Sequence, residues 1–331
     1  MQAQVNVVDG PGRRRALGAL LAAALVAPVP AWAQAKPLRI LVGFPAGGGT
    51  DAIARVLADR LKDELGTSVV VENKPGAGGQ LAAQALKAAA PDGATLFLSH
   101  DHTISVLPLV SKAPGFDPAR DFVPVAGFAS FVNALAVSPG TPAKTLAEYT
   151  AWVRAAGQGK GVVGVPAPAS TPEFMVKVLG ERSGLDLVPV PYRGSAPMIG
   201  DMLGNQIAAG TGSVPDFIEH HRAGRLRILA VGGTRRQALL PEVPTLAEGG
   251  IAGFEDLPYY GFFATAGTPK AALDSFAAAL GKVLADPEVD KRLTALGLAV
   301  EFMSAAQLAA REQAYTRSWV QIIRKTGFTP Q

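Results

Sequence analysis

The residues that could do chemistry begin with a glycine-rich loop, Pro45–Asp51, whose sequence is PAGGGTD. Apolar residues 38–44 precede it and apolar residues at helical spacing follow it, so the loop is predicted to join a buried strand to a helix. Thr50 and Asp51 are favourable N-cap residues, and the glycines let a ligand approach the main chain closely. Because a helix N-terminus carries about half a positive charge, such a loop can bind an anion without Arg or Lys. A plain turn is the alternative interpretation.

A second loop of the same kind is predicted further along the chain. Val162–Val165 is predicted to be a strand and Pro166–Ser170 a loop. Ser170-Thr171-Pro172-Glu173 then has the capping box and early proline of a helix start. Ligands of α/β sheets bind beyond the carboxyl ends of strands, where both loops are expected. Two helix N-termini would then face one cavity, although the same residues are also consistent with ordinary helix ends.

Two histidines, His100 and His102, follow a predicted strand that should border this cavity. His100 is a candidate to donate a hydrogen bond to a ligand carboxylate, with a charge adjustable near neutral pH. The alternative is a solvated pair beside Asp101. His-x-His with Asp101 also offers zinc ligands. The remaining histidines, His220 and His221, are predicted roughly 10 Å along another helix, so no metal site is expected.

The elements that must position these loops alternate along the chain. Further strands are predicted at Ser68–Glu72, Thr95–Ser99, Leu187–Val190, Gln206–Ala209 and Leu226–Val231, and helices at Gln80–Ala90, Ala196–Leu203, Val214–Arg222 and Ala305–Lys325. Alternation of this length predicts βαβ units and parallel sheets covered on both faces. Phe131–Ser138 and Tyr259–Thr265 are predicted to cross between two such lobes. The expected fold class is therefore α/β, with two doubly wound lobes joined by two crossing strands: residues 36–135 plus 262–331, and residues 136–261.

The N-terminus predicts export. Arg13, Arg14 and Arg15 precede an apolar run at 16–27, and Ala31-Trp32-Ala33 supplies a small-x-small cleavage site. This order is typical of a secretory signal peptide, here residues 1–33, and the run is short for a membrane span. A retained anchor is the alternative, and the paired arginines leave the twin-arginine and general secretion routes both open.

Composition narrows the function classes. The 331 residues are 48% apolar, which permits a large core. Removing residues 1–33 takes away three Arg and one Asp, so the formal net charge falls from +4 to +2 and no basic field suited to nucleic acid remains. The absence of cysteine excludes disulfides, thiol catalysis and a lipid-modified N-terminal Cys. A soluble exported monomer is expected, in the periplasm if the source is a Gram-negative bacterium.

Enzyme motifs are missing from the sequence. There is no G-x-S-x-G nucleophile elbow, and the glycine loops lack both the G-K-[ST] ending of a P-loop and the G-x-G-x-x-G spacing of a dinucleotide site. We therefore assign no catalytic residues and expect no cofactor. An exported α/β hydrolase-like enzyme acting on carboxylate esters is the alternative function.

Several segments, in this order, resemble the receptors of tripartite tricarboxylate transporters, the TctC or Bug family. The segments are PAGGGTD at Pro45–Asp51, VENKPGAGG at Val71–Gly79, APDGATL at Ala90–Leu96, PYRGSAP at Pro191–Pro197, LLPEVPTLAE at Leu239–Glu248 and LADPEV at Leu284–Val289. The resemblance covers residues 36–328. It implies a type II periplasmic-binding-protein fold, the two-lobed Venus flytrap, without catalytic activity. Such proteins capture small carboxylates, and some deliver them to a membrane permease.

The resemblance also maps a site onto this chain. It implies that backbone N–H groups, hydroxyls and water hold the ligand carboxylate at Phe44–Asp51, and that a second loop lies at Val165–Glu173. Pro166 and Pro168 stand where small polar residues are usual, which removes two donors, and Gly212 stands where Asp is frequent. The candidate ligand-binding residues are Phe44, Ala46, Gly47, Gly48, Gly49, Thr50, Asp51, His100, Ala169, Ser170, Thr171, Tyr192, Gly212 and Ser213.

Within this set, Thr50, Ser170, Thr171 and Ser213 are expected to supply hydroxyls. Arg193, beside Tyr192, either pairs with a carboxylate or is a solvated charge. The predicted function is periplasmic capture of a small mono-, di- or tricarboxylate, for a transporter of the tripartite tricarboxylate type or as an orphan receptor or sensor. The sequence does not identify the acid.

Overall fold

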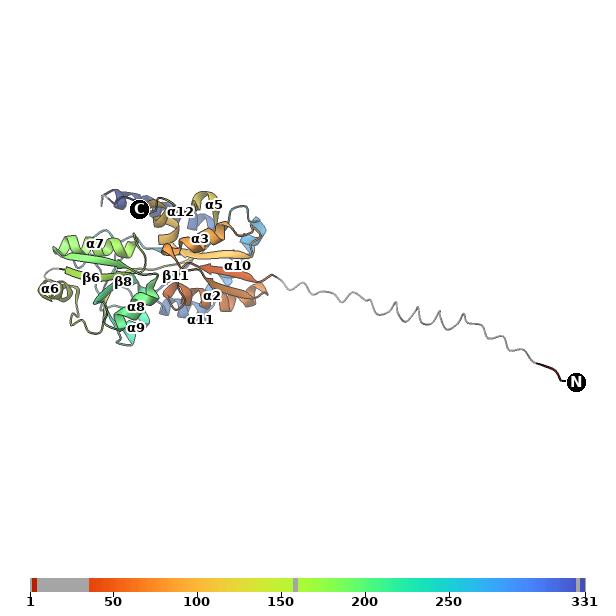
Figure 1. The fold of residues 1–331 in the computed structure, drawn as a ribbon, viewed down its shortest axis with the longest axis horizontal. Helices are drawn as coiled ribbons and strands as arrows, with labels where there is room; N and C mark the ends of the chain where they lie inside the picture. Colours follow the sequence, from red (N-terminus) through yellow and green to blue (C-terminus); the bar gives the residue numbers. More distant parts are fainter. Residues whose placement is uncertain (1, 5–35, 157–159, 326–327, 331) are drawn as a thin grey trace. The chain divides into compact units, whose positions relative to one another are not determined.

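The computed structural model describes residues 2–4, 36–156, 160–325 and 328–330 (Figure 1). The chain divides into two units, residues 1–35 and 36–331, and the second unit holds every helix and strand described below. The predicted signal peptide, residues 1–33, lies outside the described residues apart from 2–4. Within those ranges, no helix combines the length and the apolar character needed to cross a membrane.

The first sheet has six strands among the described residues, in the order β11-β4-β10-β3-β1-β2. They are β1 Leu38–Val42, β2 Val69–Asn73, β3 Thr95–His100, β4 Phe122–Ser130, β10 Tyr259–Thr265 and β11 Ala299–Ser304. β1 pairs in parallel with β2 and β3, whereas β10 runs antiparallel to both β3 and β4. Parallel neighbours need a helical crossover, and the helices α2 (Gly49–Leu65) and α3 (Gln80–Lys87) supply the two crossovers.

The second sheet repeats this plan with five strands in the described part of the chain, in the order β7-β6-β8-β5-β9. The strands are β5 Asn133–Val137, β6 Lys160–Val165, β7 Asp186–Pro191, β8 Ala209–Ser213 and β9 Arg227–Val231, and the helices are α6 Leu146–Ala156, α7 Thr171–Ser183, α8 Ser195–Leu203 and α9 Val214–Arg222. A parallel block, β7-β6-β8, is again followed by an antiparallel strand, β5. In each sheet, the first strand after the chain crosses from the other lobe, β5 or β10, pairs antiparallel with the parallel block.

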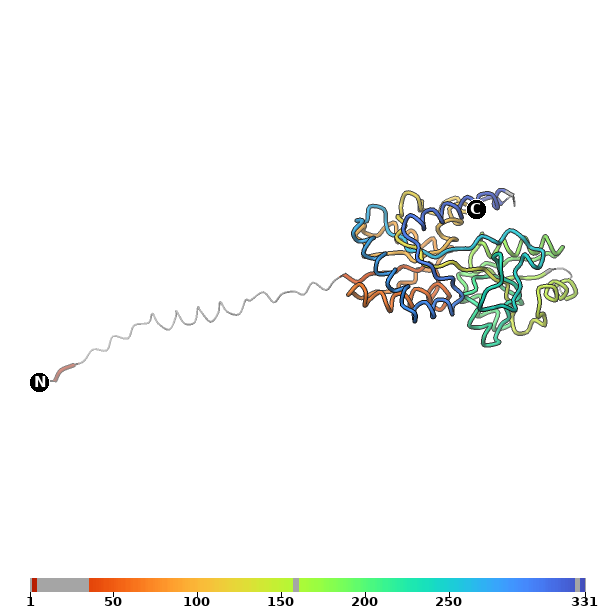
Figure 2. The backbone as a smooth tube through the Cα atoms, turned by 180° about the vertical axis from the view of Figure 1, so that it is seen from behind, coloured from red at the N-terminus to blue at the C-terminus, as the bar shows by residue number. Residues whose placement is uncertain are grey.

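The two sheets form two lobes (Figure 2). The chain leaves the first sheet through Phe131 and Val132, between β4 and β5, and returns through residues 232–258, between β9 and β10. The predicted crossing strands each lie within one sheet, because β5 pairs only with second-sheet strands and β10 only with first-sheet strands among the described residues. The predicted boundaries at 135/136 and 261/262 fall inside these strands, so we propose boundaries at residues 131–132 and within 232–258.

Two details of the predicted strands need correction. The strand predicted at Gln206–Ala209 in fact begins at Ala209 and continues to Ser213. The prediction missed it because its residues, AGTGS, are buried but are too small and polar to form an apolar run. The strands β4 and β11 were not predicted. β4 contains Pro124 and Gly127, which weaken a strand pattern, and β11 is an edge strand with mostly exposed residues. The other predicted strands and helices are confirmed within a few residues.

Helices cover both faces of each sheet. In the first lobe, α2, α10 (Lys270–Ala285) and α11 (Pro287–Ala295) pack on one face, and α3, the π-helix η3 (His102–Val106) and α12 (Ala305–Lys325) pack on the other. In the second lobe, α6 and α7 lie opposite α8 and α9. The helix α12 reaches both lobes (Figure 1), since the Trp319 ring lies 5.2 Å from the ring of Phe174 in α7.

The buried Leu308 anchors α12 on the first sheet, and its substitution tests this packing. A side chain added at Gly261, on β10, would collide with Leu308, and one added at Gly127, on β4, would collide with Met303 and press against Leu308. The buried leucine therefore fills space that the two glycines leave open. Leu308→Ala leaves a cavity there, and we expect the free energy of unfolding to fall by about 3 kcal/mol. Urea unfolding measures the loss.

The matched control is Leu81→Ala, because Leu81 is 50% exposed. This change should cost less than about 1 kcal/mol. Equal losses for the two variants would contradict the seating of α12.

Candidate functional site

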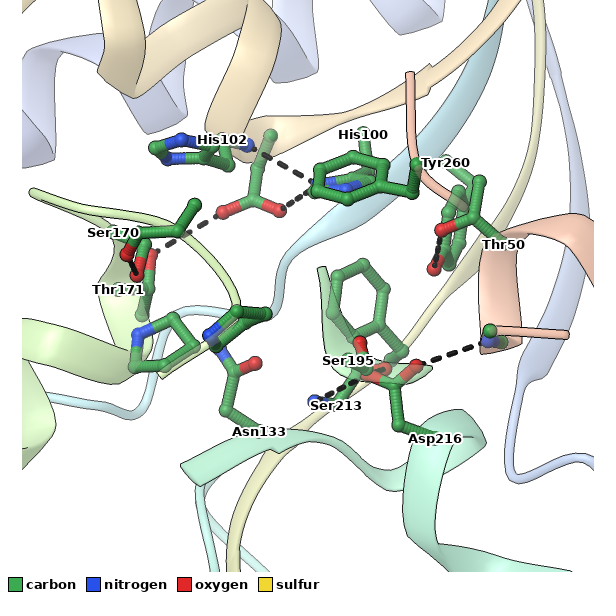
Figure 3. Close-up of a pocket in the computed structure, with 18 of the residues that line it drawn as sticks. Thr50, His100, His102, Asn133, Ser170, Thr171, Ser195, Ser213, Asp216 and Tyr260 are labelled. Atoms are coloured by element: carbon green, nitrogen blue, oxygen red, sulfur yellow. Dashed lines mark hydrogen bonds and ion pairs between the residues drawn. The ribbon is translucent and has the colours of Figure 1, made fainter. Parts of the chain in front are cut away.

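A cavity of about 50 Å³ lies between the two lobes (Figure 3). Its lining comes from both lobes: Phe44, Pro45, Gly48, Gly49, Thr50, His100, Asp101, His102, Phe131 and Tyr260 from the first lobe and the crossing, and Asn133, Pro166, Ala167, Ser170, Thr171, Pro172, Ser195, Ser213 and Asp216 from the second. A space of this size holds about three or four water molecules. The site therefore fits a small molecule.

Four helices begin at this cavity. α2 starts at Gly49, α7 at Thr171, α8 at Ser195 and α9 at Val214, and each contributes lining residues from its first turn or its cap. The N-terminal amides of a helix carry a partial positive charge. No Lys or Arg stands among the described lining residues. The partial positive charges of these helix starts therefore favour an anion, whereas the carboxylates of Asp101 and Asp216 in the lining oppose one.

The PAGGGTD loop owes its shape to Asp51. The backbone φ of Gly47 is +84°, a left-handed conformation that glycine adopts at little cost. The Gly47 amide donates to the Asp51 carboxylate at 3.0 Å, and Arg55 and Asn73 donate to the same carboxylate. Burial would raise the pKa of Asp51, but the hydrogen bonds from Arg55, Gly47 and Asn73 outweigh it and hold the pKa below its usual value. Asp51 stays ionised and fixes the loop.

Two of the predicted hydroxyls cap helices. The Ser170 hydroxyl accepts from the Glu173 amide at 3.4 Å and donates to the Ala167 carbonyl at 2.7 Å. The Ser213 hydroxyl donates to the Asp216 carboxylate at 2.6 Å, and the Ser213 amide donates to the same carboxylate at 3.1 Å as half of a capping box at the start of α9. Both hydroxyls lie at the cavity, but the protein's own backbone and side chains already use them.

The other two hydroxyls belong to the first turns of α2 and α7. The Thr50 hydroxyl lies 3.2 Å from the Tyr260 hydroxyl, and the Thr171 hydroxyl donates to the Asp101 carboxylate at 3.4 Å. The backbone amides of Thr50 and Thr171, one in each lobe, find no acceptor within the described part of the chain. Both residues line the cavity, so each lobe brings one unpaired helix-start amide to its wall.

Three aromatic rings pack around the imidazole of His100. It stacks on Phe44 with ring centroids 5.0 Å apart and meets Phe131 and Tyr260 edge-on. Its Nδ1 lies 3.2 Å from an Asp101 carboxylate oxygen, which orients the ring. The His102 amide also donates to this Nδ1, at 3.4 Å, so the other nitrogen, Nε2, is the one left for a bound molecule. It donates a hydrogen bond when it carries a proton and accepts one when it does not.

His102 is buried in the π-helix η3, and neither of its ring nitrogens has a hydrogen-bond partner among the described residues. Burial, reinforced by the nearby His100, lowers the pKa of His102 to about 4, so the ring is neutral at physiological pH. Over the described ranges, no group of three or more His, Cys, Asp or Glu side chains could hold a metal ion.

The structure brings most of the predicted site residues together. Phe44, Gly48, Gly49, Thr50, His100, Ser170, Thr171 and Ser213 line the cavity. The residues Ala46, Gly47, Asp51, Ala169, Tyr192 and Gly212 do not.

Each of these six residues has another place in the structure. Ala46 is exposed, and Gly47 and Asp51 hold the loop. The Ala169 amide donates to the Glu173 carboxylate. Tyr192 lines a separate hollow, and its hydroxyl donates to the Asp201 carboxylate at 2.7 Å. A side chain on Gly212 would meet the Phe217 ring.

The sequence analysis did not place Asp101, Asn133, Ser195 or Asp216 in the site. Ser213-Val-Pro-Asp216 is a capping-box pattern at a helix start, and this signal could have located Asp216. Asn133 gives no local signal, because only the passage of the chain between the lobes brings it to the cavity.

Comparison with known proteins identifies the family. The family model described as TctC, tripartite tricarboxylate transporter family receptor, matches residues 53–328. The chain belongs to the TctC family. Protein BugT of Bordetella pertussis is 32% identical to this TctC chain, with 92% of the chain and 94% of BugT covered. The predicted resemblance is confirmed, and TctC proteins are periplasmic solute-binding receptors.

Solved structures give the same fold. The periplasmic binding protein BugD matches with a TM-score of 0.84 and 30% identity, over 89% of this chain and 99% of BugD. Rpa4515 of R. palustris with adipate matches with a TM-score of 0.84 and 28% identity, over 89% and 98%. MatC of Rhodopseudomonas palustris with bound malate matches at 0.80 and 27%, over 87% and 98%. This TctC chain therefore has the predicted two-lobed α/β fold of periplasmic binding proteins.

The buried His102 makes a pH-dependence testable. The unfolded chain binds a proton near pH 6.5, whereas folded His102 does so only near pH 4, so this residue lowers the free energy of unfolding as the pH falls between these values. The full effect is about 3 kcal/mol. In His102→Asn we expect this component to vanish, so the variant gains stability relative to the wild type on acidification.

Urea unfolding of both proteins at neutral and acidic pH measures the difference. The variant must be compared with the wild type at each pH, because Glu312 also titrates in this range. Burial raises the pKa of Glu312 to about 7, so this residue increases the free energy of unfolding as the pH falls, which is opposite to the effect of His102. Parallel pH profiles would contradict the burial of a neutral His102.

Proposed function

We propose that this TctC-family chain captures a small organic acid between its two lobes. The observation that carries the proposal is the cavity at which four helices from both lobes begin, with no Lys or Arg among its described lining residues. Backbone amides at helix starts bind carboxylates without a cationic side chain. The adipate and malate of the neighbouring TctC-fold structures belong to the same chemical class and support the proposal.

Capture would use donors from both lobes. In our proposal the ligand carboxylate accepts a hydrogen bond from the unpaired amide of Thr171, and the His100 Nε2 adds a donor when it carries a proton. A second oxygen of the ligand accepts from the unpaired amide of Thr50, in the other lobe. These groups converge only when the lobes meet, so ligand binding favours the closed form. The joins at residues 131–132 and 232–258 are the places where the hinge would bend.

The sequence and the family support a proposal for the cellular setting. We propose that residues 1–33 are removed during export and that the remaining protein works as a monomer in the periplasm. Some TctC-type receptors serve a membrane permease of the tripartite tricarboxylate type, and this chain would deliver its acid to such a permease or report it as a sensor. The binding step is the same in both cases.

No specific observation favours the alternative ester hydrolase. Among the described lining residues, the hydroxyls of Ser170 and Ser213 bond to a carbonyl and a carboxylate rather than to a histidine, so neither is activated as a nucleophile. Turnover of a carboxylate ester would support an enzyme, whereas stoichiometric binding without product supports a receptor.

The direct test is a thermal-shift screen of the purified protein with mono-, di- and tricarboxylates. A ligand that binds only the folded state at about 100 times its Kd adds about 2.7 kcal/mol to the stability. We expect at least one acid to raise the Tm by several degrees and to bind with one-to-one stoichiometry in calorimetry. No response to any acid would contradict the proposal.

His100→Phe tests the role of the imidazole. Phenylalanine keeps the stacking on Phe44 but removes the nitrogen that faces the ligand. A hydrogen bond to a charged group is worth about 1.5–3 kcal/mol, so we expect the acid to bind at least about tenfold more weakly by calorimetry.

The matched control for this change is His100→Gln, whose amide can still donate a hydrogen bond. It should keep part of the affinity. Unchanged binding in His100→Phe would remove the imidazole from the site.

A further inference from the structure

A carboxylate of the protein itself occupies the point where the two lobes touch. Asp216 lies in the first turn of α9, in the second lobe, and its Oδ2 accepts from the Ser213 amide at 3.1 Å and from the Ser213 hydroxyl at 2.6 Å. Its Oδ1 accepts from the Gly49 amide at 2.9 Å, at the first residue of α2 in the other lobe. Asp216 therefore joins the N-termini of two helices that belong to different lobes (Figure 3).

This contact uses donors that a ligand would otherwise need. The Gly49 amide donates to Asp216, and the Gly47 amide donates to Asp51, so the protein's own carboxylates occupy two donors of the PAGGGTD loop. The cavity itself measures only about 50 Å³. A ligand carboxylate at the start of α2 would have to displace Asp216 or lie beside it, and two like charges in a small closed space repel each other.

The opposite side of the cavity is built differently. Asp101, from the first lobe, accepts from the Thr171 hydroxyl at the start of α7, and its other oxygen lies against His100. The His100 imidazole is a base that can carry a positive charge against Asp101, and its Nε2 is left for an anion. Among the described lining residues, no ionisable base lies against Asp216, since its donors are a backbone amide of each lobe and a hydroxyl. The two sides therefore differ in charge.

We propose, on the basis of the acid-binding function proposed above, that Asp216 determines which acids bind. The side of His100 and Thr171 accepts one carboxylate. The side of Asp216 accepts a hydrogen-bond donor, such as a hydroxyl, an ammonium or an amide group, and rejects a second carboxylate. The preferred ligand is then a short acid with one carboxylate and a donor at its other end. This preference differs from the two carboxylates of adipate and malate in the neighbouring structures.

Calorimetric titration with three acids of equal carbon number tests the assignment: 4-hydroxybutyrate, 4-aminobutyrate and succinate. The wild type should bind the hydroxy acid or the amino acid at least about tenfold more tightly than succinate, because only succinate places a charge against Asp216. Asp216→Asn removes the charge at nearly constant size, and the preference should fall to within about threefold.

Two further variants show whether a change in ligand preference is specific to the charge at position 216. Glu219→Gln removes the same charge from an exposed position on α9 and should leave the preference unchanged. Asp216→Glu keeps the charge and should keep the preference, and an intact Tm for each variant shows that it is folded.

The possible failures are distinguishable. A wild type that prefers succinate, or a preference that survives in Asp216→Asn, would overturn the role of Asp216 and leave the proposed function standing. Binding of none of the three acids, nor of any acid in the thermal-shift screen, would overturn the proposed function and with it the role of Asp216.

Discussion

The structure depends on how backbone amides at helix starts are satisfied. A buried N–H group without an acceptor costs free energy, and four helices begin around one closed space. Side chains of the protein accept hydrogen bonds from some of these amides. Asp51 accepts from the Gly47 amide, Asp216 from the Gly49 amide at the start of α2, and Ser170 from the Glu173 amide in α7. The amides of Thr50 and Thr171 stay without an acceptor in the described residues. An acid that supplies the missing oxygens would stabilise the closed form, which links binding to lobe closure.

The repeated sheet plan explains why these helix starts meet. In each lobe, a parallel block places loops at the carboxyl ends of its strands, and one antiparallel strand arrives from the other lobe. Because the chain crosses twice, these ends of the two sheets face each other across the cavity. The reciprocal contacts of Asp101 with α7 and of Asp216 with α2 then connect each lobe to a helix start of the other. A carboxylate from either lobe can therefore imitate part of a ligand.

Much of this arrangement could be predicted from local sequence. The PAGGGTD loop, the caps at Ser170 and Ser213 and the alternation of strands and helices depend on neighbouring residues, and so they were recognisable. Hydrogen bonds between distant residues were not, because no pattern near Asp216 shows that it reaches Gly49 across 167 positions. Tyr192 was among the predicted site residues, but its hydroxyl donates to the Asp201 carboxylate on its own lobe, a contact that its neighbours in sequence do not reveal. The strand β8 was misplaced since small buried residues carry no apolar signal.

The central claim is that main-chain amides of both lobes, without a cationic side chain, hold the acid. A crystal structure of the protein with a bound monocarboxylate tests this most directly. We expect a carboxylate oxygen about 3 Å from the amide nitrogen of Thr171 and a second ligand oxygen about 3 Å from the amide nitrogen of Thr50, with no Lys or Arg in contact. A carboxylate paired with Arg193, which lines a separate hollow, or bound elsewhere outside the cavity, would contradict it.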